Sequence, residues 1–550
     1  MKTTTYTLKL LSSLVKVFPD EEPVYQPECL PLSALAGETV SFQAAYHSST
    51  SFKEKLTVHI DSPLRDMIHI RSVEVVPVGL ACNAKTDDNY LRTSSGLYPD
   101  LLKEIPDCIV WAHTNQWQSL WIDLIVPFTC ESGTYPLTVE LRKDGTVVCK
   151  KSMKITLYNV KLPHLDLMHT EWFYADCLAS YYHVDIFSEA HWKLIENYLH
   201  EYTSRCCNMI YTPLFTPPLS MEVGGDRPTL QLIGVTLENG SYTFDFSKFR
   251  RWVTLCQNCG IEYFEMSHLF SQWGAKYPPK VIATVDGKEE KIFGWHTPVT
   301  GAYAHFLHCF IPELIHELKA LHIDKKTVFH ISDEPREHHL NTYKTAHDIV
   351  AELLKDYDTM DALSSYEFYK HGLVDKPIPG NNEIAEFFAH GLTNMWVYYC
   401  TAQCVDVSNR FMSMPSSRNR IYGIQIYKYD IIGILHWGYN FYYDHYSTHC
   451  LDPYAVTDAE YAFPSGDSFL VYPGEDGYPL ESIRMMVHYH ALCDYRALKL
   501  LESLTDKEYV LHLIEDELVE PLTFTTFPKS DFYLISLRNK VNAEIAKRVL

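Results

Sequence analysis

Two adjacent carboxylates, Asp333 and Glu334, are the residues of this sequence whose types and spacing best suit acid–base chemistry. They follow residues 327–332, a β-branched and aromatic run that predicts a buried strand. Pro335 prevents simple continuation of a strand ladder. Acids at the C-terminal end of a parallel strand lie where α/β enzymes place their active sites. The alternative is an acidic pair that only caps the helix predicted after His339 or lies solvated in a loop.

Polar and aromatic side chains also follow several other predicted strands. The set comprises Glu171, Trp172, Tyr174, Asp176, His268, Trp396, Tyr398, Tyr399, His436, Trp437, Tyr439 and Asn440. If the strands form a barrel, their ends converge on one face, so these residues would line a common pocket. Aromatic walls with a few carboxylates suit a sugar ring, whereas the alternative for any single aromatic residue is packing in the core.

Histidines and cysteines give weaker signals for a metal site. His330, His338 and His339 surround the acidic pair, but the H-E-x-x-H spacing of zinc hydrolases does not occur. Cys256 and Cys259 have C-x-x-C spacing without a second such pair, whereas a structural zinc site normally needs four ligands. We therefore predict no metal and no other cofactor.

Composition and charge narrow the class of partner. The chain has 550 residues, of which 46% are hydrophobic and 13% aromatic, enough for two or three packed domains. A net charge of −22 disfavours a nucleic acid or an anionic membrane as partner, because phosphate binding needs a basic surface. No run approaches the roughly 20 apolar residues of a membrane span, and the N-terminus resembles a first strand more than a signal peptide. We expect a cytoplasmic protein; its oligomeric state is unknown.

The pattern of apolar residues changes near residue 162. Residues 1–161 alternate in period two, with a hairpin signal at Asp144-Gly145, and predict an N-terminal β-sandwich domain. Residues 165–550 alternate between strand and helix patterns and predict a (β/α)8 barrel with C-terminal helices. The clearest helical patterns cover residues 189–205, 339–357 and 481–501. A doubly wound open sheet is the alternative, but no glycine-rich phosphate motif follows any strand.

A series of short motifs extends over most of the chain. They are residues 96–102 (GLYPDLL), 116–122 (QWQSLWI), 133–135 (GTY), 331–335 (ISDEP), 433–440 (GILHWGYN), 470–474 (LVYPG), 481–484 (ESIR) and 494–495 (DY). Each is weak alone, but in this order they resemble glycoside hydrolase family 123, the β-N-acetylgalactosaminidases, and related uncharacterised bacterial proteins. The resemblance implies a β-sandwich followed by a (β/α)8 barrel, and a glycan or glycoconjugate substrate.

The resemblance also implies a role for each acid. In that family an adjacent Asp-Glu pair performs retaining, substrate-assisted hydrolysis through an oxazolinium ion. The match implies that Glu334 is the general acid and then the base that activates water. Asp333 would hydrogen-bond the 2-acetamido N–H and orient its carbonyl for attack. Neighbouring side chains at one strand end diverge and cannot easily straddle a sugar, which agrees with a nucleophile supplied by the substrate.

The remaining site assignments concern substrate binding. Tyr398 or Tyr399 is a candidate for the acetamido carbonyl, and Trp437 for the apolar floor. Further candidates for sugar contacts are His268, Asn440, Tyr472, Trp396 and Tyr174.

The leading hypothesis is thus an exo-acting β-N-acetylgalactosaminidase. One alternative is another β-hexosaminidase or glycosidase on the same scaffold, because one fold hosts many specificities. Another is a noncatalytic carbohydrate-binding protein. The mechanistic rival is conventional double displacement, with Glu171 or Asp176 as the second carboxylate.

Overall fold

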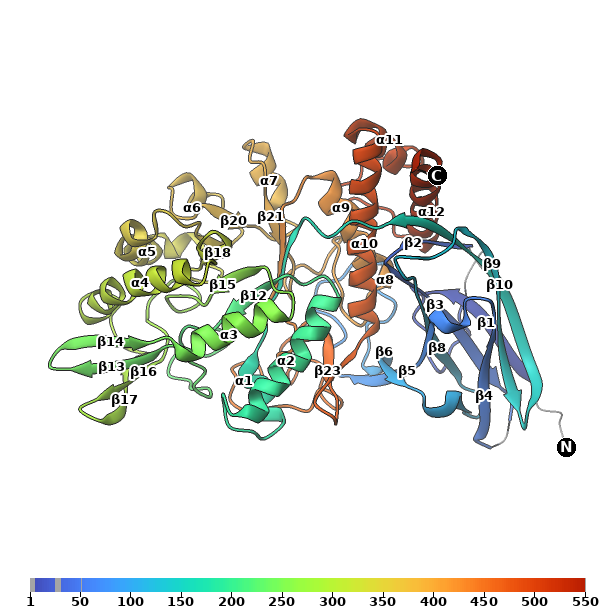
Figure 1. The fold of residues 1–550 in the computed structure, drawn as a ribbon, viewed down its shortest axis with the longest axis horizontal. Helices are drawn as coiled ribbons and strands as arrows, with labels where there is room; N and C mark the ends of the chain where they lie inside the picture. Colours follow the sequence, from blue (N-terminus) through green and yellow to red (C-terminus); the bar gives the residue numbers. More distant parts are fainter. Residues whose placement is uncertain (1–4, 25–30, 51, 550) are drawn as a thin grey trace.

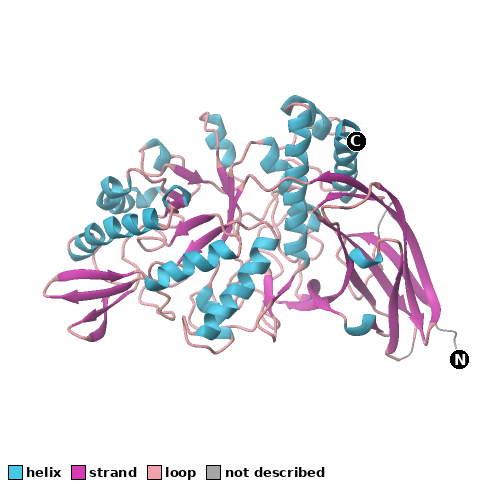
Figure 2. Ribbon diagram, viewed as in Figure 1, coloured by secondary structure: helices cyan, strands magenta, loops and turns pink. Residues whose placement is uncertain are grey.

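In residues 5–24, 31–50 and 52–549, which the computed structural model describes, ten N-terminal strands form two five-stranded sheets (Figures 1 and 2). Sheet 1 has the order β1 (Tyr6–Ser12), β3 (Thr39–Ser48), β8 (Trp117–Ile125), β5 (Ile68–Val78) and β6 (Gly96–Glu104). Sheet 2 has the order β2 (Leu32–Ala36), β10 (Thr146–Lys161), β9 (Gly133–Lys143), β4 (Glu54–Asp61) and β7 (Ile109–Ala112). Two 3-10 turns, η1 (Arg65–Met67) and η2 (Pro106–Cys108), precede β5 and β7.

The alternation of side chains along β8 shows how these sheets pack. Leu120 and Ile122 lie in an apolar cluster shared by the two sheets, whereas Trp121 between them lies in the large cluster of the C-terminal region. Because successive side chains of a strand point to opposite faces, β8 of sheet 1 contributes to both clusters. The predicted hairpin at Asp144-Gly145 is confirmed: it joins β9 to β10, and both residues have positive φ.

Eight short parallel strands follow in the C-terminal region. They are β11 (Met168–Glu171), β12 (Met209–Thr212), β15 (Tyr263–Met266), β18 (Thr327–Phe329), β19 (Met360–Ala362), β20 (Lys376–Ile378), β21 (Trp396–Tyr398) and β22 (Gly433–His436). Six of them form one sheet, in the order β18-β15-β12-β11-β22-β21. The β19–β20 pair connects to it through two single parallel bridges, Phe329–Thr359 and Gly380–Tyr398. The pairings therefore run in chain order and return from β22 to β11.

Helices lie between successive parallel strands. They are α1 (Ala175–Tyr181), α2 (Glu189–Ser204), α3 (Ser247–Asn258), α4 (Ala302–Ala320), η3 (Asp324–Lys326), η4 (Glu337–His339), α5 (Leu340–Leu354), α6 (Glu367–Lys370), α7 (Ile384–Ala389), α8 (Ser416–Arg420) and α9 (Tyr422–Lys428). A four-stranded sheet projects at the left of Figure 1; it comprises β14 (Ser241–Asp245), β13 (Gly234–Glu238), β16 (Val281–Val285) and β17 (Lys288–Phe293). The predicted helices over 189–205 and 339–357 are confirmed as α2 and α5, and Ser188 caps α2 through the His191 N–H.

A long helix stands between the N-terminal sheets and the parallel strands (Figure 1). This is α10 (Ile483–Leu504), which Ser482 caps and which confirms the helix predicted over 481–501. It follows the small hairpin β23 (Val471–Pro473) and β24 (Pro479–Glu481) and precedes α11 (Lys507–Glu515) and α12 (Asp531–Val549). Of the described helices, none is both long enough and apolar enough to cross a membrane.

Buried charges fasten sheet 1 to the start of α10. Arg484 donates from Nε and Nη2 to the two oxygens of Asp100, at 2.8 and 2.9 Å, and the Tyr472 hydroxyl donates to Asp100 at 2.7 Å. Arg71 of β5 pairs with Asp123 of β8 and with Glu481 of β24. Paired charges of this kind are costly to break because the surviving partner stays buried.

Replacement of Asp100 by Asn should therefore destabilise the protein by about 3–5 kcal/mol, the usual cost of leaving a buried arginine unpaired. Urea denaturation measures the change. The double variant D100N/R484M should recover part of the loss, because it also removes the unpaired charge. Arg251→Met, which breaks an exposed pair with Glu189, is the control and should change stability by less than about 1 kcal/mol. An unchanged midpoint in D100N would contradict this account.

Candidate active site

A cavity of about 660 Å³, partly continuous with solvent, lies at the C-terminal ends of the parallel strands. Its lining comprises Trp172, Tyr174, Ser220, Gln272, Trp273, Asp333, Glu334, Ala362, Tyr398, Cys400, Thr401, Leu435, Trp437, His445 and Phe463. These residues lie at or after seven of the eight parallel strands, which is the expected consequence of strand ends that meet at one edge. The mixture of aromatic rings with a few polar groups suits a sugar.

Asp333 and Glu334 both line this cavity but have different partners. Gln272 Nε2 donates to Asp333 Oδ2 at 2.7 Å, and the Trp273 N–H donates to the Asp333 carbonyl at 3.0 Å. The Tyr398 hydroxyl donates to Glu334 Oε1 at 2.9 Å. Glu334 has a φ of 43°, a left-handed conformation that is uncommon outside glycine and that surrounding contacts must maintain.

The strand before the pair is shorter than predicted. The sequence predicts a strand over residues 327–332, but β18 ends at Phe329. The reason is Asp361, at the centre of β19, whose carboxylate accepts hydrogen bonds from the N–H groups of Ile331 and Ser332, each at 3.2 Å. These backbone groups therefore leave the strand ladder, and the chain can turn toward the cavity.

His330 lies buried between two carboxylates under this turn. Its Nδ1 is 3.0 Å from Asp361 Oδ1 and its Nε2 is 2.6 Å from Glu265 Oε1. Burial alone would lower the pKa of His330, but its hydrogen bonds to Asp361 and Glu265 outweigh burial and raise the pKa to about 10. The ring is therefore an imidazolium at neutral pH. Glu265 also accepts from Trp172 Nε1 at 2.7 Å, which orients an aromatic wall of the cavity.

The charge environment acts most strongly on Asp333. Burial raises the pKa of this carboxyl well above its ordinary value, and the charges of Glu334 and Asp361 raise it further. The Gln272 hydrogen bond and the His330 charge act in the opposite direction. Burial also raises the pKa of the Tyr174 hydroxyl well above its ordinary value, and this hydroxyl has no partner among the described residues.

Contacts from the loop between β5 and β6 reach the rim of the cavity. Asn83 Nδ2 donates to the carbonyl of Thr401 at 2.7 Å. The Leu80 N–H donates to Asp458 at 2.7 Å, and the Asp458 carbonyl in turn accepts the Phe463 N–H. Loops from both halves of the chain therefore position the rim.

Five of the ten predicted site residues line the cavity together: Asp333, Glu334, Tyr174, Tyr398 and Trp437. The other five do not belong to its lining. Asn440 bonds the backbone of Tyr174 at both N–H and carbonyl, and Tyr472 bonds Asp100 at the contact with sheet 1.

The last three of these residues have packing contacts instead. Trp396 begins β21 and covers Gly433, where a Cβ would lie 2.1 Å from its ring. Tyr399 alternates away from Tyr398 and packs on Tyr422 and His436. His268 Nδ1 forms a hydrogen bond with the Tyr211 hydroxyl at 2.9 Å, and its ring stacks on the His330 ring.

The lining also includes residues that the sequence did not single out. They are Ser220, Gln272, Trp273, Ala362, Cys400, Thr401, Leu435, His445 and Phe463. Ser220 and Trp273 have positive φ, like Glu334, and lie in loops after β12 and β15. A weak signal existed for Trp273, because Gly274 follows it, but no periodic pattern marks residues in such loops.

One group of potential metal ligands includes the buried His330. His268, His330 and Asp361 present ligand atoms within 4.8 Å of one another. Both nitrogens of His330 already face carboxylates, and a metal ligand must offer a free lone pair. This group does not fit a metal.

Comparison with known proteins gives one family. Residues 172–501 match the model of the glycoside hydrolase 123 catalytic domain. A family 123 glycoside hydrolase from Clostridium perfringens, described with the details of glycolipid glycan hydrolysis, superposes with a TM-score of 0.72 at 16% identity; the match covers 99% of this chain and 98% of that one. A GH5 xyloglucanase from Bacteroides ovatus matches with a TM-score of 0.32 at 8% identity, over 88% of this chain and 100% of that one. No curated sequence matches.

The raised pKa of Asp333 predicts a pH-dependent effect of Asp333→Asn on stability. The unfolded chain releases this proton near about pH 4, whereas the folded protein keeps it to higher pH. The contribution of Asp333 to the stability of the wild type is therefore fully present below about pH 4. It is lost as the pH rises through the pKa of this carboxyl in the folded protein. The variant cannot ionise, so its Tm should exceed that of the wild type by a margin that grows with pH.

Asp348→Asn is the control of opposite sign, because the Lys344 hydrogen bond lowers the pKa of Asp348. The contribution of Asp348 is present above about pH 4 and is lost below it, so thermal melts between about pH 2 and pH 8 measure both effects. A margin for Asp333→Asn that shrinks with rising pH would contradict the assignment.

Proposed function

Because the chain belongs to glycoside hydrolase family 123, we propose that it is a retaining exo-glycosidase that removes terminal β-linked N-acetylgalactosamine by substrate-assisted catalysis. One observation carries this proposal. In the part of the chain that the structure describes, the only carboxylates in the cavity lining are Asp333 and Glu334, which are neighbours in the sequence. A conventional retaining enzyme needs a nucleophile about 5 Å from the acid, across the sugar. With both acids adjacent in the turn that follows β18, the 2-acetamido group is the available nucleophile.

We propose for each acid the role that the family resemblance implies. Glu334 protonates the glycosidic oxygen and the C1–O bond breaks as the acetamido carbonyl oxygen bonds to C1. Glu334 then takes a proton from water, which attacks C1, reopens the oxazolinium ring and retains the anomeric configuration. Tyr398 holds the Glu334 carboxyl through Oε1.

Asp333 accepts the acetamido N–H and stabilises the positive charge that develops on the ring. This role needs its anion, which the Gln272 N–H and the nearby His330 imidazolium favour. The acetamido N–H is a further donor that supports the ionised form when substrate is bound. The proposed mechanism requires the acidic proton to be on Glu334 when substrate is bound.

The rival carboxylates have other partners. Glu171 makes two hydrogen bonds of 2.7 Å to Arg410, and Asp176 is bound by Arg227 at 2.6 Å; neither belongs to the cavity lining. This geometry disfavours double displacement. A different β-hexosaminidase specificity, or a noncatalytic carbohydrate-binding protein, is the remaining alternative, since the axial 4-hydroxyl contact is not assigned.

We also infer that the ring of eight parallel strand pairings is a (β/α)8 barrel, and that sheets 1 and 2 form a β-sandwich before it. On this interpretation residues 1–161 form the sandwich domain and residues 165–550 the barrel with its C-terminal helices. The chain-order pairing of the strands and the apolar cluster shared by sheets 1 and 2 support the division.

Glu334→Gln tests the acid. It should lower kcat/KM by about 10²–10⁴ on an N-acetylgalactosaminide with an alkyl leaving group, because that oxygen needs a proton in the transition state. The loss should be smaller on a dinitrophenyl glycoside, whose leaving group departs as an anion. Asp333→Asn is the matched comparison and should lose activity on both substrates. Equal losses of Glu334→Gln on both would remove Glu334 from the acid role.

Substrates with a modified 2-acetamido group test whether that group is the nucleophile. Nitrophenol release from the β-N-acetylgalactosaminide should fall stepwise as the acetyl methyl is fluorinated, because fluorine withdraws electrons from the attacking carbonyl oxygen. The plain β-galactoside should not react, and the glucosaminide reports on specificity at C4. Hydrolysis of the galactoside would refute the assisted mechanism, and inertness of all substrates would favour a binding protein.

A further inference from the structure

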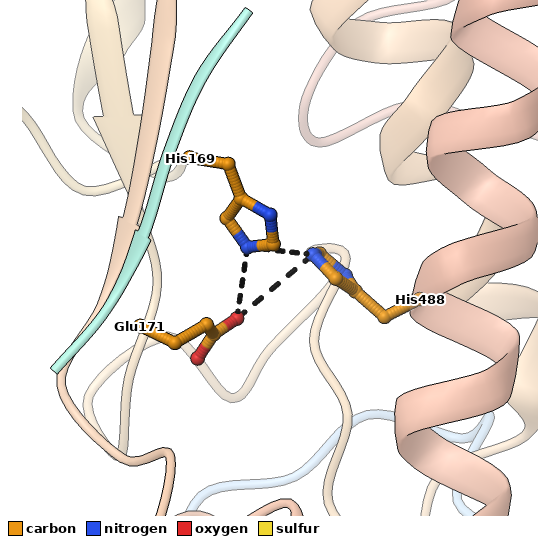
Figure 3. Close-up of side chains that lie close together, drawn as sticks. All are labelled: His169, Glu171 and His488. Carbon is orange, nitrogen blue, oxygen red and sulfur yellow. Dashed lines mark hydrogen bonds and ion pairs between the residues drawn. The ribbon is translucent and has the colours of Figure 1, made fainter. Parts of the chain in front are cut away.

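Three side chains from β11 and α10 converge beside the strand end that supplies Trp172 to the cavity. Figure 3 shows the imidazoles of His169 and His488 and the carboxylate of Glu171 pointing toward one another. His169 Nε2 lies 3.3 Å from His488 Nε2 and 3.3 Å from Glu171 Oε1. The remaining separation, from Glu171 Oε1 to His488 Nε2, is 3.9 Å.

Hydrogen bonds within this group cannot satisfy all three of the atoms that face one another. His169 Nδ1 faces the carbonyl of Cys206 at 3.1 Å, and because a carbonyl only accepts, Nδ1 carries a proton. In the neutral ring, Nε2 of His169 therefore has no proton. Its lone pair faces a carboxylate oxygen and a second imidazole. One proton can bridge only one of the three pairs of atoms, whereas a cation contacts all three.

We propose that His169, Glu171 and His488 bind a divalent zinc-type cation. A point equidistant from the three ligand atoms lies about 2.1 Å from each, which is the length of a Zn–N or Zn–O bond. Two imidazoles and one carboxylate form a known zinc ligand set. The bond from His169 Nδ1 to a backbone carbonyl is the outer contact that usually fixes the tautomer and orientation of a metal-binding histidine.

Arg410 carries a positive charge close to the proposed ion. Its guanidinium bonds both oxygens of Glu171 and lies across that carboxylate. Oε1 accepts one bond from Arg410 and keeps a second lone pair for the metal. Asp467, within 3.4 Å of His436 Nε2 and bonded by Trp437, adds a further negative charge to the same buried region.

Cys207 does not belong to this group of ligands. Its sulfur lies 3.9 Å from His169 Nε2, but it is not among the ligand atoms that lie within 4.8 Å of one another. His169 and Glu171 come from β11, whereas His488 comes from α10. The ion would thus fasten α10 to the parallel strands, as a structural site that is independent of the proposed glycosidase activity.

The site is enclosed. The side chains of His169, Glu171 and His488 are 2%, 1% and 3% exposed. An ion held there must enter during folding and should resist chelators in the native state. This property distinguishes it from adventitious surface metal.

The test measures metal in the full-length protein, expressed with added zinc and dialysed against EDTA. The wild type should retain about one zinc per chain, and His488→Gln at least about tenfold less. His490→Gln, on the same helix and equally buried, is the control and should retain the metal. Cobalt substitution adds a spectroscopic readout: visible d–d bands of tetrahedral Co²⁺ should appear in the wild type and vanish in His488→Gln.

A measurement on the wild type alone covers the case in which His488→Gln does not fold. Protein unfolded in guanidinium with EDTA should refold to the native Tm only when zinc is supplied. Full recovery without metal, or a wild type with less than about a tenth of an ion per chain, would overturn the proposal in favour of a bridging proton. Metal that remains in His488→Gln would place the ion elsewhere and overturn it as well.

Discussion

The buried charge sequence Glu265–His330–Asp361 is the interaction on which the geometry of the cavity depends. Each ion alone would cost several kcal/mol in this environment, so the three are stable only in their paired arrangement. Asp361 also accepts hydrogen bonds from the Ile331 and Ser332 N–H groups, which therefore do not take part in the strand ladder. Glu265 uses its remaining capacity on Trp172. The acidic pair and the aromatic wall opposite it are therefore positioned by one electrostatic unit rather than by separate loops.

Buried ion pairs also hold the two halves of the chain together. The motifs that carry the family resemblance lie mostly there and not in the cavity: Asp100 belongs to the first, Tyr472 and Arg484 to two of the last, and all three meet in one buried cluster. Asp494, from the final motif, pairs with Arg420 and with Arg538 of α12. The motifs that carry the resemblance therefore contribute to the contact between the two halves of the chain as well as to the cavity.

Patterns along the chain predict the elements well where the cause is local. The period-two strands, the hairpin at Asp144-Gly145 and the helices α2, α5 and α10 follow from neighbouring residues. The rule that parallel strand ends converge also predicted Asp333, Glu334, Tyr174, Tyr398 and Trp437 as neighbours in space.

The same rule could not separate cavity residues from packing residues when the cause is distant. Tyr472 is bound by an aspartate 372 positions away, and Trp396 lies at the beginning rather than the end of its strand. Trp273 and Ser220 reach the cavity through left-handed backbone turns, which leave no periodic trace in a sequence. The length of β18 depended on Asp361, whose partners are 29 and 30 residues before it.

The contacts of Leu80 and Asn83 with the rim loops have a consequence for how this architecture can diversify. A C-terminal region that carried its whole pocket could exchange the N-terminal sheets freely by gene fusion. Here a segment of the N-terminal half helps to shape the mouth of the pocket, so the two halves must be inherited together. New specificities would then arise by paired changes on both sides of the junction, and substitutions at its surface would drift in step rather than independently.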